Sequence, residues 1–106
     1  MGLDGVDVDY EGTEGNHAED RAAFAQFISE LSTALRAQGK ILTIDSFPYI
    51  WNAPNVDWWP DWVGKIDNIH SMGYDLNFEG GTGWEKYSWL QNTSVAAGHD
   101  PKTLLI

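Results

Sequence analysis

The acidic side chains best suited to chemistry stand at alternate positions near the start of the chain. Residues 3–11 alternate with a period of two and include β-branched side chains, which predicts a strand with one apolar and one acidic face. The acidic face carries Asp7, Asp9 and Glu11. Carboxylates about 6.6 Å apart repel one another, and in a buried site one of them keeps its proton near neutral pH. Such an acid can protonate the leaving oxygen of a glycosidic bond.

Two other interpretations fit part of the same pattern. An ordinary acidic strand on the surface has the same alternation, and spacing alone does not separate it from a catalytic strand. A calcium loop of the EF-hand type matches the three acids and Gly12 at its positions 1, 3, 5 and 6. Its position 12 requires a glutamate, however, and this chain has Ala18 there.

Residues 4–11 read Asp-Gly-Val-Asp-Val-Asp-Tyr-Glu, and this run resembles the motif Asp-Gly-x-Asp-x-Asp-x-Glu of the family 18 glycoside hydrolases, the chitinase family. In that family the motif lies on the fourth strand of a (β/α)8 barrel. A second family feature, Met-x-Tyr-Asp on the sixth strand, is matched by residues 72–75, two predicted strands downstream. The resemblance covers strands four to seven. It implies that residues 1–106 are a single partial catalytic domain, an α/β fold of parallel β/α units forming half of a (β/α)8 TIM barrel.

The resemblance also implies roles for single residues. Glu11 would protonate the scissile oxygen, and the N-acetyl group of the substrate, not an enzyme side chain, would attack the anomeric carbon with net retention. Asp9 would orient the acetamide group, and Asp7 would share a proton with Asp9. The second motif would supply the substrate-binding residues, which are Tyr74 to the acetamide oxygen, Asp75 to the sugar ring and Met72 beneath it. Tyr74 and Met72 also fit as ordinary core residues.

The activity implied is chitinase-like hydrolysis of β-1,4-linked N-acetylglucosamine. An endo-β-N-acetylglucosaminidase acting on N-glycans shares the motif and is the enzymatic alternative, and a non-catalytic chitin-binding fragment is the other. The expected partner is chitin or an N-acetylglucosamine oligosaccharide, with no cofactor and no metal. The parent protein is expected to be secreted, with its signal outside this chain.

Strands and helices alternate along the remaining chain, and this order predicts a parallel sheet with right-handed crossovers. A helix is expected over 18–37, with one apolar stripe and Gly39 as its stop. The stripe consists of Phe24, Phe27, Ile28, Leu31 and Leu35. The apolar run 40–46 predicts a strand covered on both faces. Active sites of such folds collect where strands end, and Glu11 is expected as the last residue of its strand.

The later elements are less sharply marked. A long loop over 47–60 leads into a short helix around 59–64, with Pro60 in its first turn. A strand over 66–74 precedes a helix over 84–97, and a last strand begins at 102. Both end strands of the predicted sheet, 3–9 and 102–106, would expose unpaired edges, so a homodimer through these edges is expected.

Composition excludes several classes of partner. Acidic residues number 16 against 6 basic ones, which gives a formal charge of −10 and disfavours nucleic acid and anionic membranes. Aromatic side chains after the predicted strands could stack on a sugar, although packing is the commoner use of each; they are Phe47, Tyr49, Trp51, Trp58 and Trp84. The three histidines, 17, 70 and 99, have no metal-ligand spacing and are expected to be ordinary loop or core residues.

Overall fold

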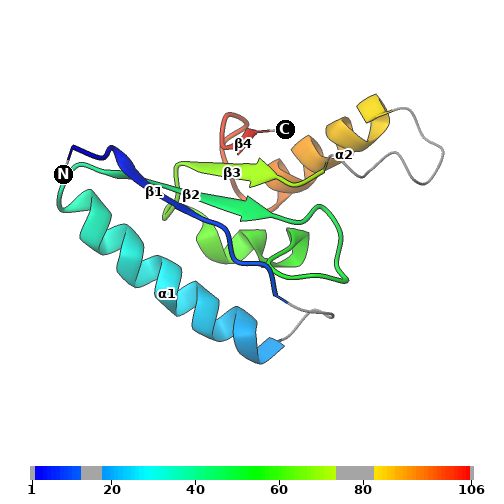
Figure 1. Cartoon of the computed structure of the whole chain (residues 1–106). Coiled ribbons are helices and arrows are strands. Elements are labelled where there is room, and N and C mark those ends of the chain that lie inside the picture. Colours follow the sequence, from blue (N-terminus) through cyan, green and yellow to red (C-terminus); the bar gives the residue numbers. More distant parts are fainter. Residues whose placement is uncertain (1, 13–17, 74–82, 106) are drawn as a thin grey trace.

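The protein is built on a four-stranded parallel sheet (Figure 1). The computed structural model describes residues 2–12, 18–73 and 83–105, and only the backbone of residues 83–86. The strands are β1 (Gly5–Val8), β2 (Ile41–Ser46), β3 (Asn68–Ser71) and β4 (Leu104–Leu105), and they lie side by side in chain order. Every neighbouring pair is parallel. This arrangement confirms the predicted fold class, which is parallel β/α units of the kind that form part of a (β/α)8 barrel.

The core lies on one face of the sheet. The helices are α1 (Ala18–Arg36), the 3-10 helix η1 (Val56–Trp62) and α2 (Gly83–Ala96). Alternate strand residues point towards them and are buried, including Leu42, Ile44 and Ile69. In Figure 1, α1 and η1 both lie below the strands, and each contributes to the same core cluster. The period-two pattern of the strands is therefore used to bury one face.

Tryptophan fills the centre of this core. Trp58, Trp59 and Trp62 of η1 have no exposed side-chain surface. The indole Nε1 of Trp59 donates to Ser46 Oγ at 2.8 Å, and Nε2 of the buried His99 lies 2.7 Å from the Trp59 carbonyl oxygen. His99 is thus a core histidine, as the sequence predicts. These hydrogen bonds satisfy polar groups that would otherwise be buried without partners.

No element within residues 2–12, 18–73 and 83–105 covers the opposite face of the sheet. Ile41 at the start of β2 and Leu105 in β4 are exposed there, and Asp45 and His70 are half-buried. The register pairs Asp45 with His70 and His70 with Leu105, so these side chains share one face. The prediction that the run 40–46 is covered on both faces is therefore wrong. Its apolar side chains reach only one packed layer.

Element boundaries also differ from the prediction in places. Strand β1 ends at Val8, so Glu11 is not its last residue. Phe27 of α1 is 48% exposed, although it belongs to the predicted apolar stripe. The short helix begins at Val56, where the Asn55 side chain caps it, and Pro60 lies inside it and not in its first turn. Helix α1 ends close to the predicted position, with Gly39 at a φ of +67°, a conformation that glycine adopts without strain.

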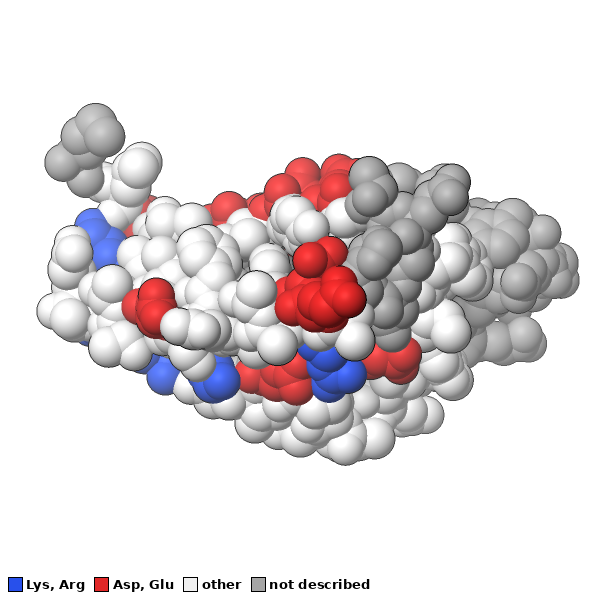
Figure 2. Space-filling view, turned by 90° about the horizontal axis from the view of Figure 1, so that it is seen from below, with Lys and Arg blue, Asp and Glu red and all other residues white. Residues whose placement is uncertain are grey.

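None of the helices in the described part of the chain is both long enough and apolar enough to span a bilayer. The formal charge of the chain is −10. On the face drawn in Figure 2, acidic side chains cover more of the surface than basic side chains do.

Candidate functional site

Glu11 lies in the segment that follows β1, at the end of the sheet where parallel strands finish. The next residue, Gly12, donates its N–H to the carbonyl oxygen of Ala53 at 2.7 Å, which ties this segment to the loop after β2. A Cβ added at Gly12 would lie 3.1 Å from that same oxygen, so the close approach favours glycine. The Glu11 side chain is exposed. No described residue encloses this side chain, so it is open to solvent at the end of the sheet.

Asp7 points to the open face of the sheet and lies among polar side chains of the two following strands. It is paired in register with Thr43, whose hydroxyl donates to Asp7 Oδ1. The same oxygen lies 3.5 Å from Nδ1 of His70. Asp9 is exposed two residues further along. Asp7 therefore lies on the predicted acidic face of β1, and Val8 lies on the opposite, apolar face.

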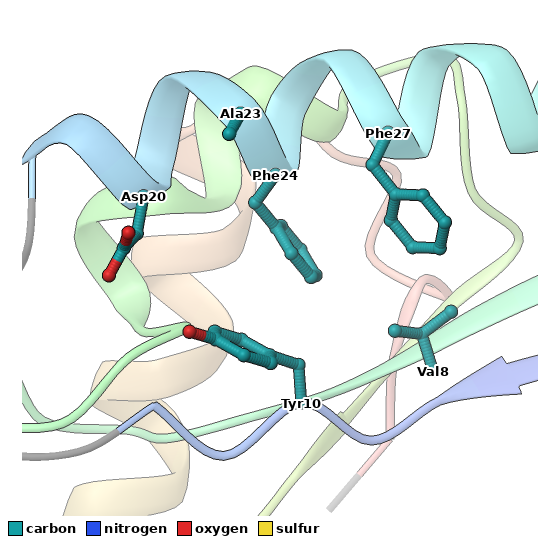
Figure 3. A pocket seen from close by; sticks show the side chains of 6 residues that line it. All are labelled: Val8, Tyr10, Asp20, Ala23, Phe24 and Phe27. Carbon is teal, nitrogen blue, oxygen red and sulfur yellow. The ribbon is translucent and has the colours of Figure 1, made fainter.

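The apolar face of β1 packs on α1. Val8 contacts the core cluster, and the Tyr10 ring stacks on Phe24 with centroids 5.7 Å apart. Between β1 and α1 a groove of about 430 Å³ remains, and its lining is mainly apolar. Figure 3 shows Phe24 and Phe27 descending from α1 towards Tyr10 and Val8. Because Asp7 has the opposite parity to Val8, this groove lies on the side of the sheet away from the Asp7 carboxylate.

Asp45 and His70 join Asp7 on the open face, and the sequence prediction missed both. Nδ1 of His70 lies 3.2 Å from Asp45 Oδ1. Burial, and then the nearby negative charge of Asp7, raise the pKa of Asp45 above its ordinary value. Asp9 adds to this effect, while the hydrogen bond to His70 opposes it. Only the sheet register brings these three strands' side chains together, so their spacing in the sequence could not have revealed the cluster.

The second motif follows β3. Met72 is half-buried, and its N–H donates to the Ser46 carbonyl oxygen at 2.9 Å. Tyr74 and Asp75 lie outside the described residues, so their expected roles remain predictions. Strand β2 lies between β1, which carries the first motif, and β3, which precedes the second. The order of the motifs predicts this arrangement.

The aromatic candidates separate into two groups. Trp58 and Phe47 are buried and serve as packing residues. Tyr49 and Trp51 stack on each other, with centroids 4.1 Å apart and ring planes 7° from parallel. Trp51 is 51% exposed. These two rings belong to the loop after β2 that is tied to Gly12, so an exposed aromatic surface lies at the same end of the sheet as Glu11. The side chain of Trp84 is outside the described set.

Comparison with known proteins yields structures but no sequence relatives. No protein-family model matches the chain, and no curated protein matches it. Among solved structures, a protein named as a sporulation-specific glycosylase of Bacillus subtilis matches 97% of this chain with a TM-score of 0.73 at 20% identity, and the match covers 35% of that chain. Catalytic domain 2 of the Group II chitinase of Ostrinia furnacalis matches 98% with a TM-score of 0.71 at 19% identity, over 33% of its length.

The Group IV chitinase of Ostrinia furnacalis matches 97% of this chain, with a TM-score of 0.64 and 20% identity, over 34% of its own length. At this level of identity the likeness concerns the fold. The chain therefore shares its α/β fold with about one third of each of these glycosylase and chitinase chains.

Proposed function

We propose that residues 1–106 form a single partial catalytic domain of a family 18 glycoside hydrolase, corresponding to strands four to seven of its barrel. The observation that carries the proposal is the complete acidic motif of residues 4–11, which ends at the carboxyl end of a parallel strand in a fold shared with chitinases. The second motif begins two strands away in the same sheet. The first motif ends, and the second begins, near the end of the sheet where such folds bind substrates.

The proposed reaction is hydrolysis of β-1,4-linked N-acetylglucosamine. The Glu11 carboxylic acid gives its proton to the glycosidic oxygen as the bond to the anomeric carbon breaks. The acetamide carbonyl oxygen of the substrate bonds to that carbon and forms an oxazolinium ion. Water, deprotonated by the Glu11 carboxylate, then opens this ion and restores the acid. Asp9 would hold the acetamide N–H with Asp7 behind it, while Met72, Tyr74 and Asp75 would contact the sugar.

The tied loop after β2 supports sugar binding at this site. A pyranose presents an apolar face of C–H groups, and flat aromatic rings are suited to contact it. Trp51 is exposed and its ring is held parallel to that of Tyr49, so the pair offers a rigid stacking surface. This observation equally favours the second candidate function, which is chitin binding without turnover.

A fluorogenic chitobioside assay tests the proposal. Wild-type turnover should be lost in Glu11→Gln, which keeps the size of the side chain but cannot donate the proton. Glu19→Gln is the matched control, because Glu19 is an exposed glutamate in the first turn of α1. Equal rates for wild type and Glu11→Gln would refute the assignment of the acid. Binding to chitin beads without turnover would favour the binding function, and release of glycan from a glycoprotein would favour the endo-β-N-acetylglucosaminidase.

A complete site requires more strands than this sheet contains. Strands β1 and β4 are the edges of the described sheet, and unpaired edges are available to another chain. A homodimer through these edges is therefore part of the proposal, together with a secreted parent protein. Light scattering at micromolar concentration gives the mass in solution, and a folded monomer would exclude the dimer.

A further inference from the structure

On the open face of the sheet, one side chain from each of three strands contributes to a cluster. The proposed reaction does not use this cluster as a unit. Asp7 comes from β1, Asp45 from β2 and His70 from β3. The cluster differs from a merely acidic patch because a neutral imidazole is a ligand for transition metals as well as a base. We propose that this cluster, termed the Asp–Asp–His cluster, binds a single divalent transition-metal ion such as zinc.

Two of the three separations between donor atoms already match the spacing that a metal ion requires. Nδ1 of His70 lies 3.2 Å from Asp45 Oδ1 and 3.5 Å from Asp7 Oδ1, and one ligand atom from each residue lies within 4.8 Å of the other two. With metal–ligand bonds of about 2.0–2.1 Å, the ligands of a tetrahedral site lie about 3.3–3.4 Å apart. The ion would thus need little movement of the side chains, and a water molecule would complete its coordination.

The backbone and a neighbouring hydroxyl hold these donors in place. Asp45 and His70 are register partners in adjacent strands, so their side chains leave the sheet side by side. Asp7 is the register partner of Thr43, two residues before Asp45 on the same face. The Thr43 hydroxyl donates to Asp7 Oδ1 and restricts the orientation of the carboxylate. Residues that hydrogen-bond to metal ligands commonly orient them in this way. Donors on three paired strands are more rigid than donors on a loop.

Charge and access also fit a cation. Among the described residues, the ion pairs of Asp7 and Asp45 are made with His70 alone, and no lysine or arginine pairs with either carboxylate. Two carboxylates against one imidazole leave negative charge that a divalent ion would neutralise. The Asp45 side chain is 22% exposed and that of His70 is 40% exposed, so an ion can enter from solvent. The imidazole selects for zinc-like ions over calcium and magnesium, which prefer oxygen ligands alone.

Isothermal titration calorimetry of the purified chain with zinc chloride tests the site without reference to any activity. We expect one zinc ion per chain. His70→Ala and Asp45→Asn should each weaken binding about tenfold or more, since loss of even an outer partner commonly lowers metal affinity 10- to 100-fold. Asp9→Asn is the matched control. It removes one carboxylate close to the cluster but no donor, and at physiological salt it should change affinity by no more than about twofold to threefold.

The outcomes separate cleanly. Absence of zinc binding, or equal binding by wild type, His70→Ala and Asp45→Asn, would overturn the proposal. If a variant fails to fold by circular dichroism, imidazole ¹⁵N spectra of the wild type decide the question instead. Zinc should then shift the Nδ1 resonance of His70, and a shift confined to His17 or His99 would contradict the site. Loss of turnover in Glu11→Gln is independent of all these readouts.

Discussion

Gly5 is predicted to be the residue at which one methyl group most disturbs the strand that carries the acids. It is paired in register with Ile41, and a Cβ added there would collide with the Ile41 carbonyl oxygen. That Cβ would also lie 2.6 Å from Ile41 Cγ1 and 2.8 Å from the Ile41 carbonyl carbon. Favourable contacts between carbon atoms require about 3.5–4.0 Å. Because backbone atoms are among those struck, β1 must move away from β2.

The expected cost of Gly5→Ala follows from this collision. Overpacking of a well-packed site destabilises by about 1–3 kcal/mol, and shifting an edge strand weakens its ladder as well. A chain of this length is expected to have a free energy of unfolding of about 5–15 kcal/mol. The substitution should therefore remove a substantial fraction of the stability and lower Tm by roughly 4 °C or more for each kcal/mol.

Urea unfolding followed by tryptophan fluorescence measures this change, since three buried tryptophans lie in the core. Hydrogen exchange in Gly5→Ala should become faster at the amides of β1 than at the amides of the other strands, because β1 opens locally. Gly2→Ala is the matched control, because an added Cβ at Gly2 meets no atom within 4 Å. A difference between the two variants of less than about 0.5 kcal/mol, which is usual for surface substitutions, would refute the reasoning.

Three further substitutions test helix α1 and its contacts. Ile28→Ala removes a fully buried side chain of α1 and should lower the free energy of unfolding by about 2–5 kcal/mol. Phe27→Ala is the control and should cost much less, because Phe27 is exposed. Equal losses in urea unfolding would mean that α1 is rotated about its axis. Arg21→Ala breaks the two hydrogen bonds to Asp61, of 2.7 and 3.0 Å. Their side chains are 35% and 28% exposed, so the loss should be only about 0.2–1 kcal/mol and should shrink at high salt. A salt-independent loss would contradict the electrostatic account.

The sequence predicted the features that depend on neighbours along the chain. The apolar stripe of α1 follows from helical spacing, and all of it except Phe27 packs on the core. Glycine predicts the helix end, and α1 ends at Arg36 with Gly39 at a positive φ. The alternation of strands and helices was sufficient to predict a parallel sheet, because parallel strands need a crossover between them. The two faces of β1 were also predictable, since a strand has a period of two.

Lengths of elements were less predictable, because they depend on what lies alongside. The alternating pattern of residues 3–11 continues beyond Val8, but β1 ends there, and the chain is then held by Gly12 and Ala53. Phe27 has the apolar character of a core residue, yet in this chain it borders an open groove. No local signal distinguishes an apolar side chain that has a neighbour from one that does not.

The sequence by itself determined the acidic motif of residues 4–11 and the resemblance that gives Glu11 its proposed role. Only the tertiary structure determined that Asp7, Asp45 and His70 meet on one face. The physical reason is sheet register. Hydrogen bonding between strands brings together residues that are 25 to 63 positions apart in the chain, and a shift of one residue would turn each side chain to the opposite face.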